Sequence, residues 1–490
     1  MDNQLVDVMS QRAAILSGDA EKTQKQRDAG KKTARERAIQ LLDEGSFVEM
    51  DTLMAKKGMG DGVVTGYGTV GERPVYLFSQ DFTVRGGAMS ELQAAKVMKM
   101  LRLAQKTGAP VVMMCDSAGA AIDEGALSIN AYADVFAQLS LMSGVCPLIA
   151  LVLGPCVGGA SLIAQLADIS IIASSVGSLM AAGPQVYAST LGKELSPKEI
   201  GGGEVMAAQG GVTFCAQDEN AAFALCSSML DLLPSCNMED APETDADLQR
   251  EMTVSDAADL DGIFAELFDG EYFEFYKDSA KGIRVCLGRI GGHTAGVVAN
   301  NGAREGGKLC ACCAKKAARF VRFCDCYSIP VVSLVNTTGL KLPELDGQAN
   351  LMKGLSQLLY AYAEATCAKI SIVTGYAIGP AYSAMGGKAN ADISYAWQNA
   401  VIAPLMPEAA VQVLMKDELK ASEGEPADAR AALAKKYCDE TACALKAAES
   451  GIVDDVIPEK DTRKYVIAAI EMLASKRDSN PPKKHGNQPM

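Results

Sequence analysis

The sequence contains an internal repeat, which restricts it to duplicated architectures. PVVMMCDSAG at 110–119 returns as PVVSLVNTTG at 330–339, 220 positions later. LVLGPCVGGA at 151–160 returns as IVTGYAIGPA at 372–381, shifted by 221 positions. Because both matches keep the same order and nearly the same spacing, the sequence predicts two copies of one domain.

Between the copies lies an acidic, proline-containing segment at 234–262 that has no apolar periodicity, as expected of a linker. We place the domain boundary near residue 245, with an N-terminal domain at 1–245 and a C-terminal domain at 246–490. A chain of 490 residues is long enough for two separate cores.

Within each copy, short β-rich runs alternate with longer helical stretches. In the first copy, PVYLFSQ at 74–80 and PVVMMC at 110–115 flank the helix-like segment at 90–108. This alternation predicts α/β units with mainly parallel strands. Residues 5–42 are predicted to form a helical extension before the first copy.

Composition narrows the classes of function. A net charge of −14 at pH 7 argues against a nucleic-acid surface, which needs a concentrated basic face. We find neither a run of about 18 apolar residues nor an apolar signal core, and we expect a cytoplasmic protein. The fifteen cysteines are expected to be reduced thiols.

Histidine and cysteine limit the chemistry further. Only His293 and His485 are present, so a Ser-His-Asp triad or a histidine-rich metal centre would depend on His293 alone. The densest cysteine group, at 310–326, lies in a helix-like segment and is interpreted as small buried side chains rather than as a metal or iron–sulfur site. Little side-chain acid–base catalysis and no metal are expected.

A glycine-rich turn follows one predicted strand in each copy. GPCVGGAS at 154–161 comes after the apolar run VCPLIALVL, and GYAIGPAY at 375–382 has the equivalent place in the second copy. A turn there exposes the first amides of a helix, so Gly158 and Gly159 would let two N–H groups point at an oxyanion. On turn chemistry alone, tight helix–strand packing explains the two glycines equally well.

Several segments share the pattern of one enzyme family, among them ARERAIQLLDEGSFVE at 34–49, FSQDFTVRGGAMS at 78–90 and KKAARFVRFCD at 315–325. Over nearly its whole length the chain resembles the carboxyltransferase subunits of biotin-dependent acyl-CoA carboxylases and decarboxylases, of the propionyl-CoA carboxylase β and methylmalonyl-CoA decarboxylase α type. The resemblance implies an α/β fold in which a crotonase-like (ClpP/crotonase) domain is duplicated in tandem.

The resemblance also implies a reaction. A carboxyl group would move between biotin on a separate carrier protein and a short-chain acyl-CoA, with the pair propionyl-CoA/methylmalonyl-CoA as the first expectation. The N-terminal domain would bind acyl-CoA and the C-terminal domain carboxybiotin. No side-chain base is required in the family, because the ureido nitrogen of biotin accepts the α-proton while two backbone oxyanion holes stabilise the enolates.

The implied partners are a biotin carrier protein and either a biotin carboxylase subunit or a membrane decarboxylase subunit. Further copies of the chain would form a hexamer built as a trimer of dimers. The direction of the reaction, carboxylation or decarboxylation, stays open. A location peripheral to a membrane complex is compatible with the decarboxylase direction.

Matching the family's motifs by position assigns the two oxyanion holes. Gly158 and Gly159 would form the hole for the acyl-CoA thioester, with Gly119 lining it. Gly379 and Ala381 would belong to the hole for biotin. These four hole residues are the predicted catalytic groups.

The remaining predicted residues bind substrate. Ala118 would lie beside the first hole, and Arg85, Gly86 and Gly87 would follow the CoA path, where the guanidinium could meet a phosphate. A solvated loop arginine explains Arg85 at least as well from the sequence. Ser383 occupies the place of a family aspartate that is associated with the choice of acyl group.

Two alternatives stay open. A biotin-independent crotonase-type hydratase or isomerase needs a positioned carboxylate, for which Asp123 and Glu124 are the candidates. A non-catalytic assembly subunit is suggested by GPAYS at 379–383, where the family has GGAYD, because Pro380 has no amide hydrogen.

One tetrapeptide, VMKM at 97–100, resembles the AMKM sequence that carries biotin on a lysine. It lies in a segment whose apolar residues recur at helical intervals, whereas a biotinyl lysine needs an exposed hairpin tip. We therefore predict that Lys99 is not biotinylated. A streptavidin blot of the purified chain should show no signal beside a stained carrier protein, and strong staining of this chain would contradict the prediction.

Overall fold

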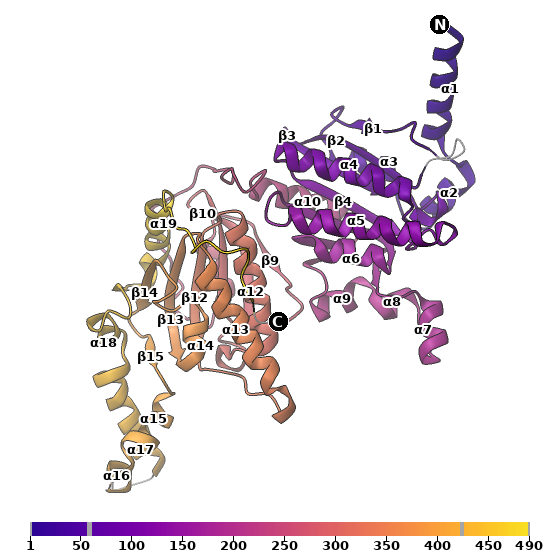
Figure 1. Ribbon diagram of the computed structural model, residues 1–490. Coiled ribbons are helices and arrows are strands. Elements are labelled where there is room, and N and C mark those ends of the chain that lie inside the picture. Colours follow the sequence, from indigo (N-terminus) through magenta and orange to yellow (C-terminus); the bar gives the residue numbers. More distant parts are fainter. Residues whose placement is uncertain (1, 56–60, 422–425, 489–490) are drawn as a thin grey trace. The chain divides into compact units, whose positions relative to one another are not determined.

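The computed structural model describes residues 2–55, 61–421 and 426–488 of the chain. The chain divides into two compact units, Met1–Asp240 (unit 1) and Ala241–Met490 (unit 2), and each contains one mixed sheet with helices packed on it (Figure 1). The prediction of a duplicated α/β fold is confirmed.

The sheet of unit 1 has parallel strands at its centre. Its path is β1 (Val48–Met50), β2 (Val63–Val70), β3 (Arg73–Gln80), β4 (Val111–Ser117), β5 (Leu148–Val157), β6 (Ile169–Ala173) and β8 (Phe214–Ala216), and β7 (Ser178–Met180) pairs with β5. The pairs β1–β2 and β2–β3 are antiparallel, and the others are parallel.

The sheet of unit 2 repeats this topology strand for strand. Its path is β9 (Tyr272–Phe275), β10 (Ile283–Ile290), β11 (His293–Asn300), β12 (Val331–Thr337), β13 (Lys369–Ile378), β14 (Ile393–Trp397) and β16 (Asp455–Ile457), and β15 (Val401–Ala403) pairs with β13. The two repeated segments found in the sequence therefore become β4 and β12, and β5 and β13.

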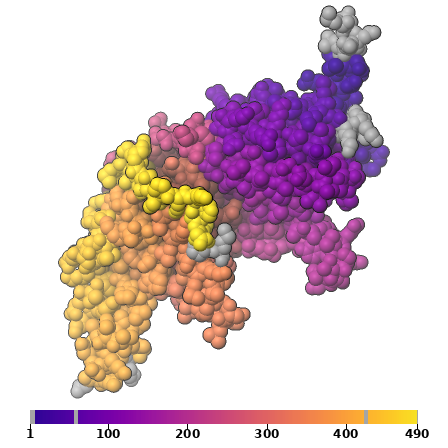
Figure 2. Space-filling model, in the orientation of Figure 1, coloured from indigo at the N-terminus to yellow at the C-terminus, as the bar shows by residue number. Residues whose placement is uncertain are grey.

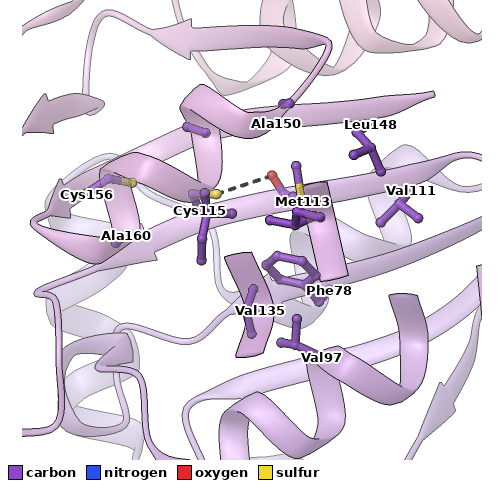
Figure 3. Close-up of a cluster of buried hydrophobic side chains, with 14 of the residues drawn as sticks. Phe78, Val97, Val111, Met113, Cys115, Val135, Leu148, Ala150, Cys156 and Ala160 are labelled. Carbon is purple, nitrogen blue, oxygen red and sulfur yellow. Dashed lines mark hydrogen bonds between the residues drawn. The ribbon is translucent and has the colours of Figure 1, made fainter. Parts of the chain in front are cut away.

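Helices cover both faces of each sheet, as buried parallel strands require. In unit 1, α4 (Glu91–Thr107) and α5 (Ala126–Met142) cover one face, and α3 (Ala34–Leu41) and α10 (Glu219–Leu232) cover the other. In unit 2, α12 (Ala311–Cys326) and α13 (Gln348–Glu364) are opposite α11 (Leu260–Leu267) and α19 (Thr462–Leu473). Figure 3 shows the core of unit 1, where Phe78 and Met113 of the sheet meet Val97 of α4 and Val135 of α5.

The remaining helices lie at the ends of the strands or outside the layers. They are α1 (Asp2–Ser17), α2 (Ala20–Asp28), α6 (Gly159–Leu166), α7 (Pro184–Leu191), α8 (Pro197–Gly201), α9 (Gly203–Gln209), α14 (Gly379–Ala384), α15 (Pro407–Leu414), α16 (Lys416–Ala421), α17 (Pro426–Tyr437) and α18 (Ala444–Glu449). The short turns of helix are η1 (Arg85–Gly87), η2 (Ile122–Glu124), η3 (Glu305–Gly307), η4 (Leu345–Gly347), η5 (Cys438–Ala442) and η6 (Glu459–Asp461).

The helical extension predicted before the first copy is confirmed by α1, α2 and α3. Helix α3 begins at a capping box, in which the Thr33 hydroxyl accepts from the Glu36 N–H and the Glu36 carboxylate accepts from the Thr33 N–H. Lys99 lies within α4 and pairs with Asp51 at 2.7 Å, so VMKM is helical as predicted.

The segment after α19 lies across unit 2, as the yellow atoms in Figure 2 show. Lys476 Nζ donates to the Cys367 carbonyl at 3.0 Å, and Asn480 Nδ2 donates to the Glu364 carbonyl at 2.7 Å. The Lys483 ammonium pairs with the Glu364 carboxylate at 2.5 Å. These contacts attach a segment without helix or strand to the end of α13.

The cysteine group on α12 is helical as predicted, but its burial differs from the expectation. Cys313 and Cys324 are buried, Cys310 is half-buried, and Cys312 and Cys326 are exposed. The expectation of buried side chains is wrong for the two exposed thiols, because α12 is amphipathic and they lie on its solvent-facing side.

A buried charge cluster attaches α3 to the sheet of unit 1. Arg37 has no exposed surface and donates to the Asp116 carboxylate at 2.9 Å, to Glu219 at 2.5 Å and to the Leu153 carbonyl at 2.7 Å. Lys31 adds a second cation 2.7 Å from Asp116. Burial raises the pKa of Asp116 in spite of both cations. The carboxylate therefore depends on these partners to stay ionised.

We predict that Arg37→Met lowers the free energy of unfolding of unit 1 by about 3–5 kcal/mol, because it leaves Asp116 and Glu219 buried without their main partner. Urea unfolding of the full chain, with amide exchange of β4 as the probe, measures this. Arg27→Met is the control, since Arg27 pairs with Glu36 at the surface and should change stability by less than about 1 kcal/mol. Equal effects of the two substitutions would contradict the prediction.

Candidate active site

The candidate site of unit 1 lies at the carboxyl ends of β4 and β5, where the parallel register is interrupted. Cys115 pairs with Val152, but the next pair joins Ser117 to Cys156, so β5 contains two extra residues. In unit 2 the same shift falls between Val335 and Thr337 of β12. Such a bulge bends a strand end out of the ladder and is typical of strand ends beside active sites.

A polar side chain fills the bulge in each unit. A Cβ atom on Gly154 would overlap the Asp116 carboxylate, and a Cβ atom on Gly375 would lie 2.5 Å from Asn336 Oδ1. Glycine is therefore required at both positions, since the polar group occupies the space of a side chain.

The two polar groups have different partners. Asn336 Oδ1 accepts from the Tyr376 N–H at 3.1 Å. The residue of unit 1 that corresponds to Tyr376 is Pro155, which has no N–H. The Asp116 carboxylate accepts from the Arg37 and Lys31 side chains instead. An ionic cluster in unit 1 thus replaces a neutral hydrogen bond in unit 2.

Two free amides begin helix α6, after the turn at Gly158. Gly158 has φ 59° and ψ −122°, a conformation that favours glycine, and its N–H donates to the Met180 carbonyl at 2.9 Å. Within the described ranges, the N–H groups of Gly159 and Ala160 donate no hydrogen bond. The donor expected at Gly158 is therefore engaged in strand pairing with β7, and the available donors are those of Gly159 and Ala160.

At Gly159 the structure shows close packing and, separately, an N–H group that is free to donate. A Cβ atom there would lie 2.8 Å from the Tyr132 ring on α5, so tight helix packing requires glycine. The N–H of the same residue has no protein acceptor among the residues described. Beneath the turn, Cys156 and Ala160 belong to the hydrophobic core (Figure 3).

The loop after β4 lies beside this turn. A Cβ atom on Gly119 would be 3.2 Å from the Val157 carbonyl oxygen, and Gly119 has φ 111°. Its N–H donates to Ser117 Oγ at 3.2 Å, and the Ala118 N–H donates to the Gly86 carbonyl at 2.8 Å. The N–H groups of Ala118 and Gly119 are therefore both engaged in hydrogen bonds that hold this loop beside the turn.

The Arg85–Gly87 segment packs against the same loop. A Cβ atom on Gly87 would overlap the Asp116 carbonyl oxygen, and Gly87 has φ 63°. The Arg85 guanidinium pairs with Asp123 and with Glu124, the latter at 3.2 Å. Asp123 and Glu124, the candidates for hydratase chemistry, are thus paired with Arg85, the candidate for binding a phosphate.

A cavity of about 510 Å³ opens beside Arg85. Its wall includes a buried ion pair between Lys96 Nζ and Asp61 Oδ1 at 3.2 Å, and burial raises the pKa of Asp61. Lys22 and Arg35 add two further cations to the lining. The cavity is large enough for part of a cofactor-sized ligand.

Unit 2 carries a turn of the same kind, in which a proline separates the two available N–H groups. Gly379 has φ 57°, close to that of Gly158, and Pro380 follows it without an N–H. In the described part of the chain, the N–H groups of Gly379 and Ala381 donate no hydrogen bond. Ser383 is exposed on α14.

The loop after β12 makes the same backbone hydrogen bond as the loop after β4. The Thr338 N–H donates to the Gly306 carbonyl at 2.9 Å, as Ala118 does to Gly86 in unit 1. Ala118 and Gly86 are among the residues predicted from the sequence, whereas Thr338 and Gly306 are not. The constant shift of 220 positions is the signal that could have identified them.

The family model of the carboxyl transferase domain matches residues 25–488 of this chain. The chain belongs to the carboxyl transferase family. This carboxyltransferase is 37% identical over 516 residues to the propionyl-CoA carboxylase, carboxyltransferase subunit, of Haloferax mediterranei, with 100% of both chains covered. It is 39% identical over 504 residues to methylmalonyl-CoA decarboxylase subunit alpha of Veillonella parvula, covering 98% of this chain and 97% of the relative.

A solved structure supports the same family. The transcarboxylase 12S hexamer, with methylmalonyl-coenzyme A and methylmalonic acid bound, matches with a TM-score of 0.94 and 36% identity over 100% of this chain and 99% of that chain. The predicted family, the duplicated crotonase-like fold and the activity of carboxyl transfer are confirmed.

We predict that Gly159→Pro lowers the kcat of this carboxyltransferase by ~10²-fold or more, the effect of removing one oxyanion donor. Helix α6 should survive, because proline is tolerated at the first helical position and Pro380 occupies the equivalent place in unit 2. Gly159→Ala is the matched control, since it adds the same Cβ atom beside Tyr132 but keeps the N–H. Equal losses in both variants would assign Gly159 to packing alone.

Proposed function

We propose that the chain exchanges a carboxyl group between biotin on a separate carrier protein and a short-chain acyl-CoA, with propionyl-CoA/methylmalonyl-CoA as the pair. The main observation behind this proposal is that, among the residues described, the Gly159 and Ala160 N–H groups donate no hydrogen bond. They lie at the amino end of a helix in a fold shared with carboxyltransferases. Relatives named for propionyl-CoA and methylmalonyl-CoA support the choice of substrate.

In unit 1, the N–H groups of Gly159 and Ala160 would donate to the thioester oxygen as negative charge develops on it. Helix α6 adds the positive end of its dipole at the same point. Donors that are fixed before the reaction need no reorganisation when the charge appears, and several kcal/mol of transition-state stabilisation can come from them. Gly158 would hold the turn in place through its bond to Met180.

In unit 2, the residues fit an oxyanion of the biotin ureido group. In the part of the chain that the structure describes, the Gly379 and Ala381 N–H groups have no protein acceptor, and the buried Ala381 leaves the turn compact. When bound, biotin supplies the nitrogen that accepts the α-proton. Pro380 removes one amide from this turn, so the hole would rely on its two neighbours.

The substrate path would pass Arg85, Gly86 and Gly87, whose loop borders the cavity beside α4. A phosphate of CoA would compete with Asp123 and Glu124 for the Arg85 guanidinium. Ser383, exposed on α14, would influence the choice of acyl group.

The transcarboxylase 12S relative is a hexamer, and this supports a hexameric assembly of the present chain. A biotin carrier and either a biotin carboxylase or a membrane decarboxylase subunit would complete the system. In the residues described, we find no helix with the length and apolar character to cross a membrane. A cytoplasmic location, peripheral to a membrane complex in the decarboxylase case, is part of the proposal.

A second candidate, a non-catalytic assembly subunit, is favoured by one observation only, the loss of a donor at Pro380. Hydratase chemistry has less support, because both candidate carboxylates are paired with Arg85.

We predict that the purified chain exchanges carboxyl groups between carboxylated carrier and propionyl-CoA faster than acetyl-CoA or butyryl-CoA, measured with isotope-labelled carboxyl groups. Avidin, which sequesters the carrier, should abolish the exchange. Turnover that persists with avidin would indicate a hydratase or isomerase. No exchange with any acyl-CoA of the panel would overturn the proposed function and favour the assembly subunit.

A further inference from the structure

Two cysteines meet at the amino end of α12 in unit 2. Cys310 is the N-cap residue, and Cys313 follows in C-x-x-C spacing. Their Sγ atoms are 3.0 Å apart, and Cys310 Sγ accepts from the Cys313 N–H at 3.3 Å. We call these two residues the dithiol pair. C-x-x-C pairs at helix amino ends are the arrangement of thiol–disulfide exchange proteins.

The two thiols differ in reactivity. Cys310 is half-buried, and the hydrogen bond from Cys313 lowers the pKa of Cys310 to about 6. Cys313 is buried, its thiol lies 3.6 Å from the Ala280 carbonyl oxygen, and the hydrogen bond to Cys310 raises its pKa. Cys310 is thus the accessible thiolate and Cys313 the protected partner.

The charged groups around the pair favour a thiolate at Cys310. Lys341 lowers the pKa of Cys310, and the Lys341 ammonium also pairs with Glu305 at 2.6 Å. Lys341 is therefore the cation that acts on this sulfur, and Glu305 shares its charge.

Capping alone does not require a thiol here. In unit 1 the equivalent positions are Ser90 and Gln93, and the Ser90 hydroxyl caps α4 by accepting from the Gln93 N–H at 3.1 Å. An oxygen therefore does the capping in one copy of the fold, and two sulfur atoms meet in the other. Among the residues described, no group of three or more Cys, His, Asp or Glu side chains could hold a metal ion.

We propose that Cys310 and Cys313 form a thiol–disulfide site through which small disulfides such as glutathione disulfide regulate carboxyl transfer at the turn of unit 2. The Cys310 thiolate attacks the disulfide RSSR, which gives Cys310–S–SR and releases RS⁻. The Cys313 thiol gives its proton to the released RS⁻ and attacks Cys310 Sγ, displacing a second RS⁻ that takes a proton from water. Two protein thiols are oxidised by two electrons, and RSSR is reduced to two thiols.

The connection to the turn of unit 2 runs through the residue next to Cys310, and this step rests on the proposed function. The Leu309 N–H donates to the Gly339 carbonyl at 3.0 Å, and the Lys341 N–H donates to the Leu309 carbonyl at 2.9 Å. Closing the S–S bond shortens the sulfur separation by about 1 Å. The movement is transmitted to the loop after β12, and this loop follows Thr337, which pairs with Ala377 two residues before Gly379.

The test uses the full chain, reduced and then incubated with glutathione disulfide. Peptide mass analysis should show a Cys310–Cys313 disulfide, and the alkylation rate of Cys310 by iodoacetamide should rise with a midpoint near pH 6. Carboxyl exchange should fall roughly 10- to 100-fold, the order expected for a displacement of about 1 Å near the chemistry. Dithiothreitol should restore it.

Three variants make the test specific. Cys310→Ser keeps the cap, as Ser90 does, and should retain exchange while resisting glutathione disulfide. Cys313→Ser should stop at a mixed disulfide on Cys310. Cys312→Ser, which removes the exposed neighbouring thiol, should respond as the wild type does.

Each outcome decides a different point. Absence of the disulfide in the wild type would overturn the redox site. A disulfide that leaves exchange unchanged would overturn the regulation. If the reduced chain shows no exchange, the proposed function and the regulation that rests on it both fail, whereas mass analysis and the alkylation midpoint still decide whether the dithiol site exists.

Discussion

The carboxylate of Asp116 is the group on which the site of unit 1 depends. It fills the bulge between β4 and β5, so its presence explains why position 154 has no side chain. The bulge leaves the Leu153 carbonyl outside the ladder, and the guanidinium of Arg37 satisfies both groups at once. A buried carboxylate is stable only with such partners. Helix α3 and the strand ends that carry the turn are therefore held by one cluster.

Unit 2 has the same bulge, but the side chain that fills it is neutral. An amide takes the place of the carboxylate, and a backbone N–H at Tyr376 takes the place of the cations. Unit 1 needs a different partner for its polar group, because Pro155 could not supply that N–H. After duplication, each copy thus kept the backbone path and changed the groups that stabilise it. The turns diverged in the same way. Among the described residues, unit 1 has two adjacent amides that donate no hydrogen bond, and unit 2 has a proline between its two donors.

Much of the fold could be predicted because its signals are local or periodic. The strand-end turns and the extension follow from patterns within a few dozen residues, and the repeat follows from one nearly constant shift of about 220 positions. What could not be predicted depends on long-range pairing. The amide of Gly158 is engaged because the three-residue strand β7 returns to β5, and no property of the turn itself shows this. The contact of Arg37 with Glu219 spans 182 positions, and Arg85 meets carboxylates 38 and 39 positions away. Helical phase likewise decided which cysteines of α12 face solvent, a distinction that composition does not make.

The contiguity of each unit has a consequence for biosynthesis. Every partner of Arg37 lies within the first 240 residues, so unit 1 has its complete set of buried charges before unit 2 exists as a chain. Ribosomes add about 5–20 residues per second, and N-terminal domains generally fold first. The first half can therefore pack its core while the second half is still being translated. Newly made chains would then expose the apolar strands of only one unfolded half at a time.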